Sequence, residues 1–183
     1  MSRAGLGHAI SQWPRRNTTH RRTEVTAWVT QVVEELERIV TSKGMHAGLE
    51  FLNRRSSHRF SGVYRFDVAD LRNLYLYDRE NPTLQLGTDQ PLHETYCSIV
   101  GRTGQTFYTS DARTDARTAD HPARESVISY CGALLSGPDG PFGSLCNFDL
   151  IPRPTTPSEI LVLEAAAPVV MATIIATRAG GWS

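Results

Sequence analysis

A chain of 183 residues with 40% hydrophobic side chains can bury one sizeable core, so we expect one domain with modest extensions. The 19 basic and 19 acidic residues leave a formal charge of zero, which argues against a surface that binds nucleic acid broadly. Three cysteines, an odd number, do not make a disulfide framework, and no secretory signal follows Met1, so a cytoplasmic protein is predicted.

The first 22 residues are the most basic stretch of the chain, with five arginines and no acid. They show no helical or strand periodicity, and turn-forming residues are interspersed. This composition predicts a disordered basic arm over 1–22. The alternative is a tether for a nucleic acid or another acidic partner.

An amphipathic helix is predicted over 23–44, because its apolar residues recur three and four positions apart with charged residues between them. A second, shorter helix is expected over 45–53. We assign the first helix to dimerisation and residues 45–178 to the domain itself.

The middle of the chain changes to a β-like pattern. Two runs, 62–67 and 73–78, are expected to pair as a hairpin. A loop follows over 80–91, and 92–103 have the length and spacing of a helix that Gly104 ends. Residues 105–109 are predicted to form a short strand.

A second hairpin forms the centre of the predicted sheet. The runs 129–135 and 142–148 flank a turn at 137–141 that is rich in glycine and proline. Both faces of these strands are mostly apolar, which is typical of a sheet covered on both sides. The preceding segment 111–124 holds many turn formers and charges and is predicted to be a surface lid.

A long helix closes the chain. Thr156-Pro157 matches a helix start with proline in the first turn. An apolar stripe runs over 160–175, and Pro168 should bend the helix without ending it. The longest apolar run, 165–177, is shorter than a membrane span, so no membrane association is expected.

This order of elements predicts an α+β fold. We expect a central antiparallel sheet of five to six strands, with the terminal helices on one face and a middle helix and the lid on the other. Strand alternation then puts Tyr130 and Gly132 on one face of the sheet and Cys131 on the other.

A set of short motifs resembles the GAF domain family over about 45–170. In chain order they are Cys97, Asp111, Asp115, His121-Pro122, Tyr130-x-Gly132-x-Leu134 and Gly143-x-Leu145-Cys146-x-x-Asp149, followed by a proline-rich link and 159–170. The resemblance implies a small-molecule pocket on the face opposite the terminal helices. It also implies a sensor or regulatory module that dimerises through those helices, and it leaves the ligand open.

The resemblance directs Tyr130, Cys146 and Phe148 into that pocket. Together with the lid groups, the candidate ligand-binding residues are Tyr96, Cys97, Phe107, Asp111, His121, Arg124, Tyr130, Cys146 and Phe148. An aromatic floor under the cationic lid side chains would suit a small, flat or weakly anionic ligand. The alternative is that the same side chains pack an empty, closed core.

Cys97 is the best redox candidate, because a thiol near the start of a helix can have a lowered pKa. One enzyme in the resembling family, the free methionine sulfoxide reductase, uses such thiols. Its main reactive cysteine falls near Ala123 here, and its substrate-binding acids fall on Tyr130, Cys146 and Phe148. Thiol-dependent reduction is therefore the alternative to a non-catalytic sensor, and the three cysteines can also be simple buried hydrophobes.

Other ligand classes have weaker motifs. His93 and Cys97 lie four residues apart and could share a helix face with Cys146 near them, but no close pair of metal-ligand residues supports a metal. Neither Gly101-x-x-Gly104 nor Gly137-x-x-Gly140 is followed by a helix, as a phosphate loop requires. The motifs of the cyclic-nucleotide and chromophore branches are incomplete, so no cofactor is assigned.

Overall fold

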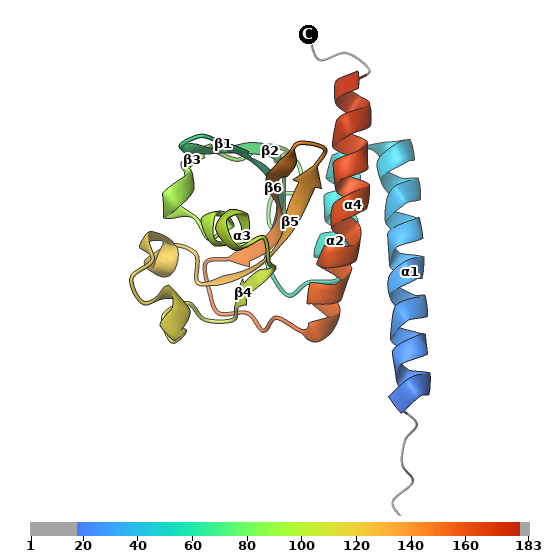
Figure 1. The fold of residues 1–183 in the computed structure, drawn as a ribbon, viewed down its shortest axis with the longest axis horizontal. Coiled ribbons are helices and arrows are strands. Elements are labelled where there is room, and N and C mark those ends of the chain that lie inside the picture. Colours follow the sequence, from blue (N-terminus) through green and yellow to red (C-terminus); the bar gives the residue numbers. More distant parts are fainter. Residues whose placement is uncertain (1–17, 180–183) are drawn as a thin grey trace, which may run out of the picture.

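The computed structural model describes residues 18–179 of the chain and the side chains of 24–179. The elements run α1 (Thr18–Lys43), α2 (Met45–Asn53), β1 (Phe60–Asp67), β2 (Asp70–Asp78), β3 (Gln90–Pro91), η1 (Leu92–Glu94), α3 (Cys97–Thr103), β4 (Phe107–Thr109), η2 (Ala116–Thr118), η3 (Pro122–Glu125), β5 (Ser129–Gly137), β6 (Gly140–Asp149) and α4 (Pro157–Ala179). This confirms the predicted α+β order (Figure 1).

The strands form one six-stranded antiparallel sheet in the order β3-β2-β1-β6-β5-β4. The two predicted hairpins, β1–β2 and β5–β6, lie side by side at its centre. In the β5–β6 turn Gly137 pairs with Gly140, whose φ of 117° is open to glycine but strained for other residues. The sequence therefore predicts the centre of the sheet correctly.

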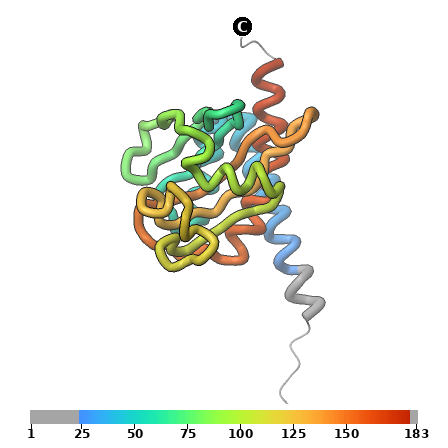
Figure 2. The backbone as a smooth tube through the Cα atoms, turned by 60° about the vertical axis from the view of Figure 1, so that its left-hand side comes forward, coloured from blue at the N-terminus to red at the C-terminus, as the bar shows by residue number. Residues whose placement is uncertain are grey.

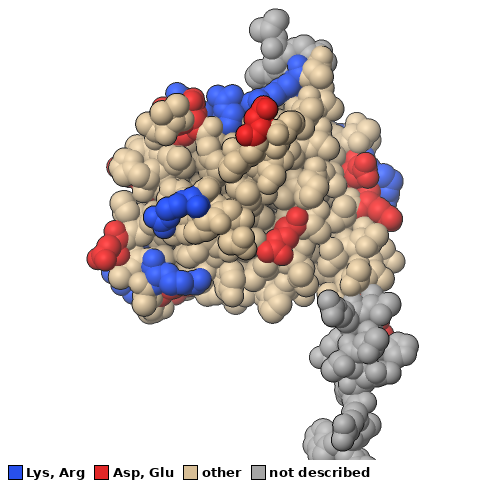
Figure 3. Space-filling model, viewed as in Figure 1, with Lys and Arg blue, Asp and Glu red and all other residues tan. Residues whose placement is uncertain are grey.

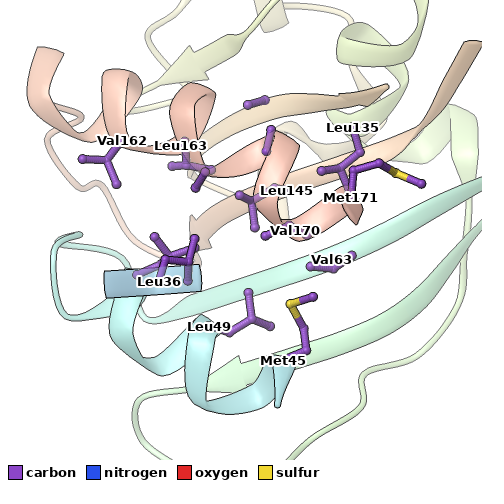
Figure 4. Packing of buried hydrophobic residues seen from close by; sticks show 14 of the residues in the cluster. Leu36, Met45, Leu49, Val63, Leu135, Leu145, Val162, Leu163, Val170 and Met171 are labelled. Atoms are coloured by element: carbon purple, nitrogen blue, oxygen red, sulfur yellow. The ribbon is translucent and has the colours of Figure 1, made fainter. Parts of the chain in front are cut away.

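Helices α1, α2 and α4 gather on one face of the sheet (Figures 1 and 2). Helices α2 and α4 contact the strands, and α1 packs outside them against both. Figure 4 shows the core between these layers. Its fully buried side chains include Leu36, Leu49, Val63, Leu145 and Val170, and burying each contributes about 1.5–3 kcal/mol.

A buried polar network joins the start of α4 to the sheet. Thr156 Oγ1 accepts the backbone N–H of Glu159 at 3.2 Å and caps the helix. The Glu159 carboxylate accepts from Ser56 Oγ at 2.6 Å and from Asn147 Nδ2 at 2.9 Å, and His58 Nδ1 lies 3.0 Å from it. Burial alone would raise the pKa of Glu159, but the contacts with these three side chains lower it.

The other face carries α3, the lid over 111–124 and the loop before β3. Figure 2 shows these green and gold segments on the side of the molecule away from the red helix α4. The single helix predicted over 92–103 is wrong, because the structure divides it into η1 and α3. Thr95 is extended between them, and its hydroxyl donates to the carbonyl of Leu92, which ends the first turn.

The ends of the chain differ from the sequence prediction in detail. Helix α1 begins at Thr18 and so includes part of the predicted arm 1–22, while residues 1–17 lie outside the described residues. Helix α4 continues through Pro168. By length and composition α4 is apolar enough to cross a membrane, yet here its buried side packs on β5, β6 and α1.

Candidate ligand-binding site

A cavity of about 360 Å³ opens on the face of the sheet opposite α4, which is near the lower end of the range for ligand pockets. Its lining comes from the sheet, from the chain around β3 and the start of α3, and from the end of the lid. These residues are Phe60, Tyr64, Leu71, Leu76, Gly87, Thr88, Gln90, Glu94, Thr95, Tyr96, Cys97, Ser126, Val127, Tyr130, Cys146, Phe148 and Leu150.

Five of the predicted site residues come together here, namely Tyr96, Cys97, Tyr130, Cys146 and Phe148. Strand alternation explains the last three, since residues two apart on one strand share a face. Phe148 stacks on Phe60 of the neighbouring strand, with ring centroids 4.8 Å apart. The aromatic floor predicted from the sequence is therefore present.

Phe107 does not line the cavity but supports it from behind. Its buried ring lies 5.6 Å from the ring of Tyr96 and 6.1 Å from that of Tyr130, centroid to centroid. Tyr96 and Tyr130 are themselves 5.6 Å apart. The three rings hold one another in place, and burial raises the pKa of Tyr96 to about 12.

The structure does not bring Asp111, His121 and Arg124 to the cavity. Asp111 pairs with Arg113, and Arg124 donates to the carbonyl oxygens of Ala112 and Arg113 inside the lid. These contacts lie within the lid, and no lysine, arginine or histidine is among the described residues that line the cavity.

His121 holds the lid together and does not reach the cavity. Its Nδ1 accepts the N–H of Ala123 at 3.1 Å and caps η3, and its ring lies 4.6 Å from that of Tyr96. Burial and the nearby Arg102 lower the pKa of His121, which favours its neutral form. His121 therefore covers the outer side of Tyr96, away from the cavity.

Cys97 has an unusual set of neighbours. Its Sγ lies 3.3 Å from the Tyr130 hydroxyl, which is also buried. Hydrogen bonding from Cys146 lowers the pKa of Cys97 to about 7 against the opposing effect of burial, and the Ser144 and Tyr130 hydroxyls contribute in the same direction. Helix α3 has only seven residues, so the lowered pKa follows from these donors, and the predicted reason, the helix start, is not needed.

The other two cysteines differ from Cys97. Hydrogen bonding with Cys97, together with burial, raises the pKa of Cys146 well above its usual range. Cys131 points to the opposite face, into the core under the helices, as alternation predicts, and burial raises its pKa. The sheet thus separates Cys131 from the Cys97–Cys146 pair.

Glycines on both sides of Cys146 make room for the tyrosines. Across the sheet, Cys146 pairs with Gly62 of β1 and with Gly132 of β5. A Cβ on Gly132 would lie 2.1 Å from the Tyr130 hydroxyl, and one on Gly62 would lie 2.5 Å from the Tyr64 ring. Each tyrosine therefore folds over the glycine of its own strand.

Sequence reasoning missed the wall that β1, β2 and the loop before β3 provide. The sequence could have identified Tyr64 as a cavity residue, because Gly62-x-Tyr64 has the same residues in reverse order as Tyr130-x-Gly132. For Thr88, in the loop, and Gln90, in the two-residue strand β3, there is none, since neither segment is long enough or regular enough to show a periodicity that reveals a direction.

The residues considered for a metal are not assembled. His93 is exposed and lies beside Glu94, whereas Cys97 and Cys146 are buried. Among residues 24–179 no three His, Cys, Asp or Glu side chains are grouped as a metal ion requires.

No protein-family model and no curated protein sequence matches this chain. Solved structures do match its fold. The free methionine-R-sulfoxide reductase of Neisseria meningitidis, determined with its substrate, aligns with a TM-score of 0.64 and 18% identity over 85% of this chain and 93% of that protein. The GAF domain of the Acinetobacter phosphoenolpyruvate-protein phosphotransferase aligns at 0.63 and 15% over 88% and 96%.

A third similar structure is the chromophore-binding domain of a bacteriophytochrome from R. palustris, with a TM-score of 0.64 and 10% identity over 83% of this chain and 63% of that one. At these identities the similarity concerns the fold alone. The chain has a GAF-like fold, and its chemistry has to be argued from its own residues.

Proposed function

We propose that this protein is a non-catalytic sensor that binds a small, uncharged, largely flat molecule in the cavity. The observation that carries the proposal is the lining itself, which combines aromatic rings with hydroxyl and thiol groups. No lysine, arginine or histidine is among the described residues that line it, and Glu94 is the one carboxylate. An anionic ligand would lose its hydration there without gaining a positive partner.

This reasoning separates the proposal from two ligand classes of GAF domains. A cyclic nucleotide carries a phosphate, and a linear tetrapyrrole carries carboxylates, and both groups need cationic or N–H donors. The lid arginines Arg113, Arg117 and Arg124 do not supply them, because their side chains are paired inside the lid. The weakly anionic ligand predicted from the sequence therefore loses its support.

Native mass spectrometry of the protein purified from its own host tests the proposal directly, because a retained molecule appears as added mass. Val127→Trp would fill part of the cavity, while Val68→Trp adds the same ring at a fully exposed position in the β1–β2 turn. We expect the added mass in the wild type and in Val68→Trp but not in Val127→Trp. An added mass that Val127→Trp retains would contradict binding in this cavity.

Charge selectivity provides a second test. At saturating concentration, indole should raise the melting temperature by about 5–10 °C, whereas its carboxylated analogue indole-3-acetate should not. Stabilisation by the carboxylate alone would contradict an uncharged ligand.

The proposed output is a homodimer formed through α1 and α4. Their outer sides expose Val25, Trp28, Leu161 and Ile175, which are large apolar residues. The helices run side by side at one edge of the molecule (Figure 1), and Figure 3 shows few charged groups over α4. A second copy of the chain could bury these side chains.

Sedimentation equilibrium at micromolar concentration checks the dimer. We expect a dimer for the wild type and a monomer for the double variant Trp28→Glu with Ile175→Glu. Val68→Glu, which places the same charge far from both helices, should remain dimeric. A monomeric wild type would remove the dimer and leave the proposed ligand site untouched.

Thiol-dependent reduction of free methionine sulfoxide is the second candidate function. It is favoured by the lowered pKa of Cys97 in the cavity and by the fold shared with the Neisseria enzyme. Against it, Tyr130, Cys146 and Phe148 replace the acids expected from the family resemblance. A turnover assay with dithiothreitol decides: activity that Cys97→Ser abolishes would replace the sensor proposal, and no turnover would exclude the enzyme.

A further inference from the structure

The lining of the cavity holds two thiols from different elements. Cys97 begins α3, and Cys146 lies in the middle of β6, against which α3 packs. Both line the cavity, and the Tyr130 hydroxyl lies between their elements: it is 3.3 Å from Cys97 Sγ and folds over Gly132, the β5 partner of Cys146. Neither is in a disulfide in the structure.

The surroundings make the two thiols unequal. The Tyr130 hydroxyl is 3.3 Å from Cys97 Sγ, and the Ser144 hydroxyl, on the same strand face as Cys146, is buried and has no hydrogen-bond partner. Hydrogen bonding with Cys146 lowers the pKa of Cys97, and these hydroxyls contribute in the same direction, which favours its thiolate. The raised pKa of Cys146 keeps that thiol protonated beside Cys97.

A thiolate beside a protonated thiol, open to a small cavity, is the arrangement that a hydroperoxide oxidises to a disulfide. We propose that Cys97 and Cys146 form a redox pair that a hydroperoxide converts into an intramolecular disulfide. This function goes beyond ligand sensing and needs only that the cavity admit a hydroperoxide, whatever its ligand.

The reaction has two balanced steps. The Cys97 thiolate attacks the terminal oxygen of ROOH, the O–O bond breaks, and the alkoxide leaves with a proton as ROH, giving Cys97 sulfenic acid. The Cys146 sulfur then attacks the Cys97 sulfur, the S–O bond breaks, and the hydroxide leaves with the Cys146 proton as water. Two thiols are oxidised by two electrons, and one peroxide is reduced.

Cys131 serves as a control that the fold itself provides. It is the residue next to Tyr130, but its side chain is on the helix-covered face and fully buried among apolar groups. The sheet stands between it and Cys97, so it cannot replace Cys146 without unfolding.

The wild-type protein tests the pair without any substitution. Reduced protein is treated with tert-butyl hydroperoxide, free thiols are then alkylated, and peptides are mapped by mass spectrometry without reduction. We expect a peptide pair joined through Cys97 and Cys146, lighter than the two separate peptides by two hydrogens, and an alkylated Cys131. A link to Cys131, or Cys97 that remains fully alkylated, would overturn the proposal.

Variants then separate the two steps. Cys146→Ser should stop at the sulfenic acid, which dimedone traps on Cys97, while Cys131→Ser should form the disulfide at the wild-type rate. Cys97→Ser should slow peroxide-dependent thiol loss by at least about tenfold. If Cys146→Ser does not fold, Cys146→Ala replaces it. An intramolecular disulfide that still forms at the wild-type rate in Cys97→Ser or in the Cys146 variant would refute the assignment.

The outcome is independent of the two proposed functions. A protein that forms this disulfide but does not turn over methionine sulfoxide is a redox-responsive sensor. Loss of the disulfide with a retained ligand would leave the sensor proposal standing.

Discussion

The two faces of the sheet differ in how completely they are filled. Under the helices the apolar side chains form one buried cluster, which includes Leu36, Val63 and Leu145 (Figure 4), and the polar groups there are joined in the network at Glu159. On the other face the rings and thiols leave a cavity of about 360 Å³. Close packing of one face stabilises the fold, so the other face can carry polar and reactive groups at a tolerable cost in stability.

The thiols should show the largest difference between the faces. At pH 7 we expect iodoacetamide to alkylate Cys97 at least about 100-fold faster than Cys131 in the folded protein, because Cys97 has a pKa of about 7 and burial raises that of Cys131. The Cys97 rate should rise as the pH increases through about 7, since the thiolate is the reacting form.

Peptide mass spectrometry at a series of reaction times measures both rates. In urea the two cysteines should react alike, which serves as the control. Equal rates in the folded state would mean that the donors around Cys97 do not stabilise a thiolate.

A pair of substitutions on β6 compares packing on the two faces. Leu145→Ala, on the helix face, should lower the free energy of unfolding by about 2–5 kcal/mol, because it leaves a hole in a filled core. Phe148→Ala, on the cavity face, should cost about 1–2 kcal/mol, since Phe148 is only partly buried and already borders open space. Urea unfolding measures both, and equal losses would show that the cavity face is as closely packed.

The network at Glu159 gives the helix face a pH-sensitive element. Glu159→Gln should lower the free energy of unfolding by about 1–3 kcal/mol at pH 7, because Ser56 and Asn147 lose a charged acceptor. The pKa of Glu159 is lowered from 4.5 in the folded protein, so its contribution is fully present above about pH 4.5 and is lost as the pH falls through the folded pKa.

Unfolding of the wild type and Glu159→Gln at pH 7 and at about pH 3 measures this effect. The two proteins should converge at the lower pH. A constant difference would indicate that packing, and not the carboxylate charge, determines the cost.

The smallest effect is expected in the lid. Arg124→Gln removes the donors to Ala112 and Arg113, and should cost about 1 kcal/mol while hydrogen exchange rises over 111–118. Arg38→Gln, which breaks an exposed ion pair on α1, should change neither quantity measurably. Unchanged exchange in Arg124→Gln would show that other contacts hold the lid.

The sequence predicts what periodicity determines. Alternation along 129–135 places Cys131 on the face opposite Tyr130, and the family resemblance directs Tyr130, Cys146 and Phe148 into the pocket; the structure agrees with both. The spacing of apolar residues likewise locates α1, α2 and α4. These elements depend on local patterns that a single sequence contains.

Side-chain partners in the loops could not be predicted in this way. The lid arginines were expected to face a ligand, yet Arg113 and Arg117 each pair with an aspartate two residues earlier, at Asp111 and Asp115. The composition of the lid shows that it contains arginines and aspartates, but it does not show which of them form ion pairs. The walls at Thr88 and Val127 depend on how loops return to the sheet, which no repeat in the sequence reveals.

Asn147 connects the two sides of the molecule within one strand. Its neighbours Cys146 and Phe148 line the cavity, while its own amide donates to Glu159 in the first turn of α4. A rotation of β6 that moved the cavity floor would therefore pull directly on the base of that helix. Oxidation at Cys146 would therefore act one peptide bond away from Asn147, the residue that is hydrogen-bonded to the first turn of α4.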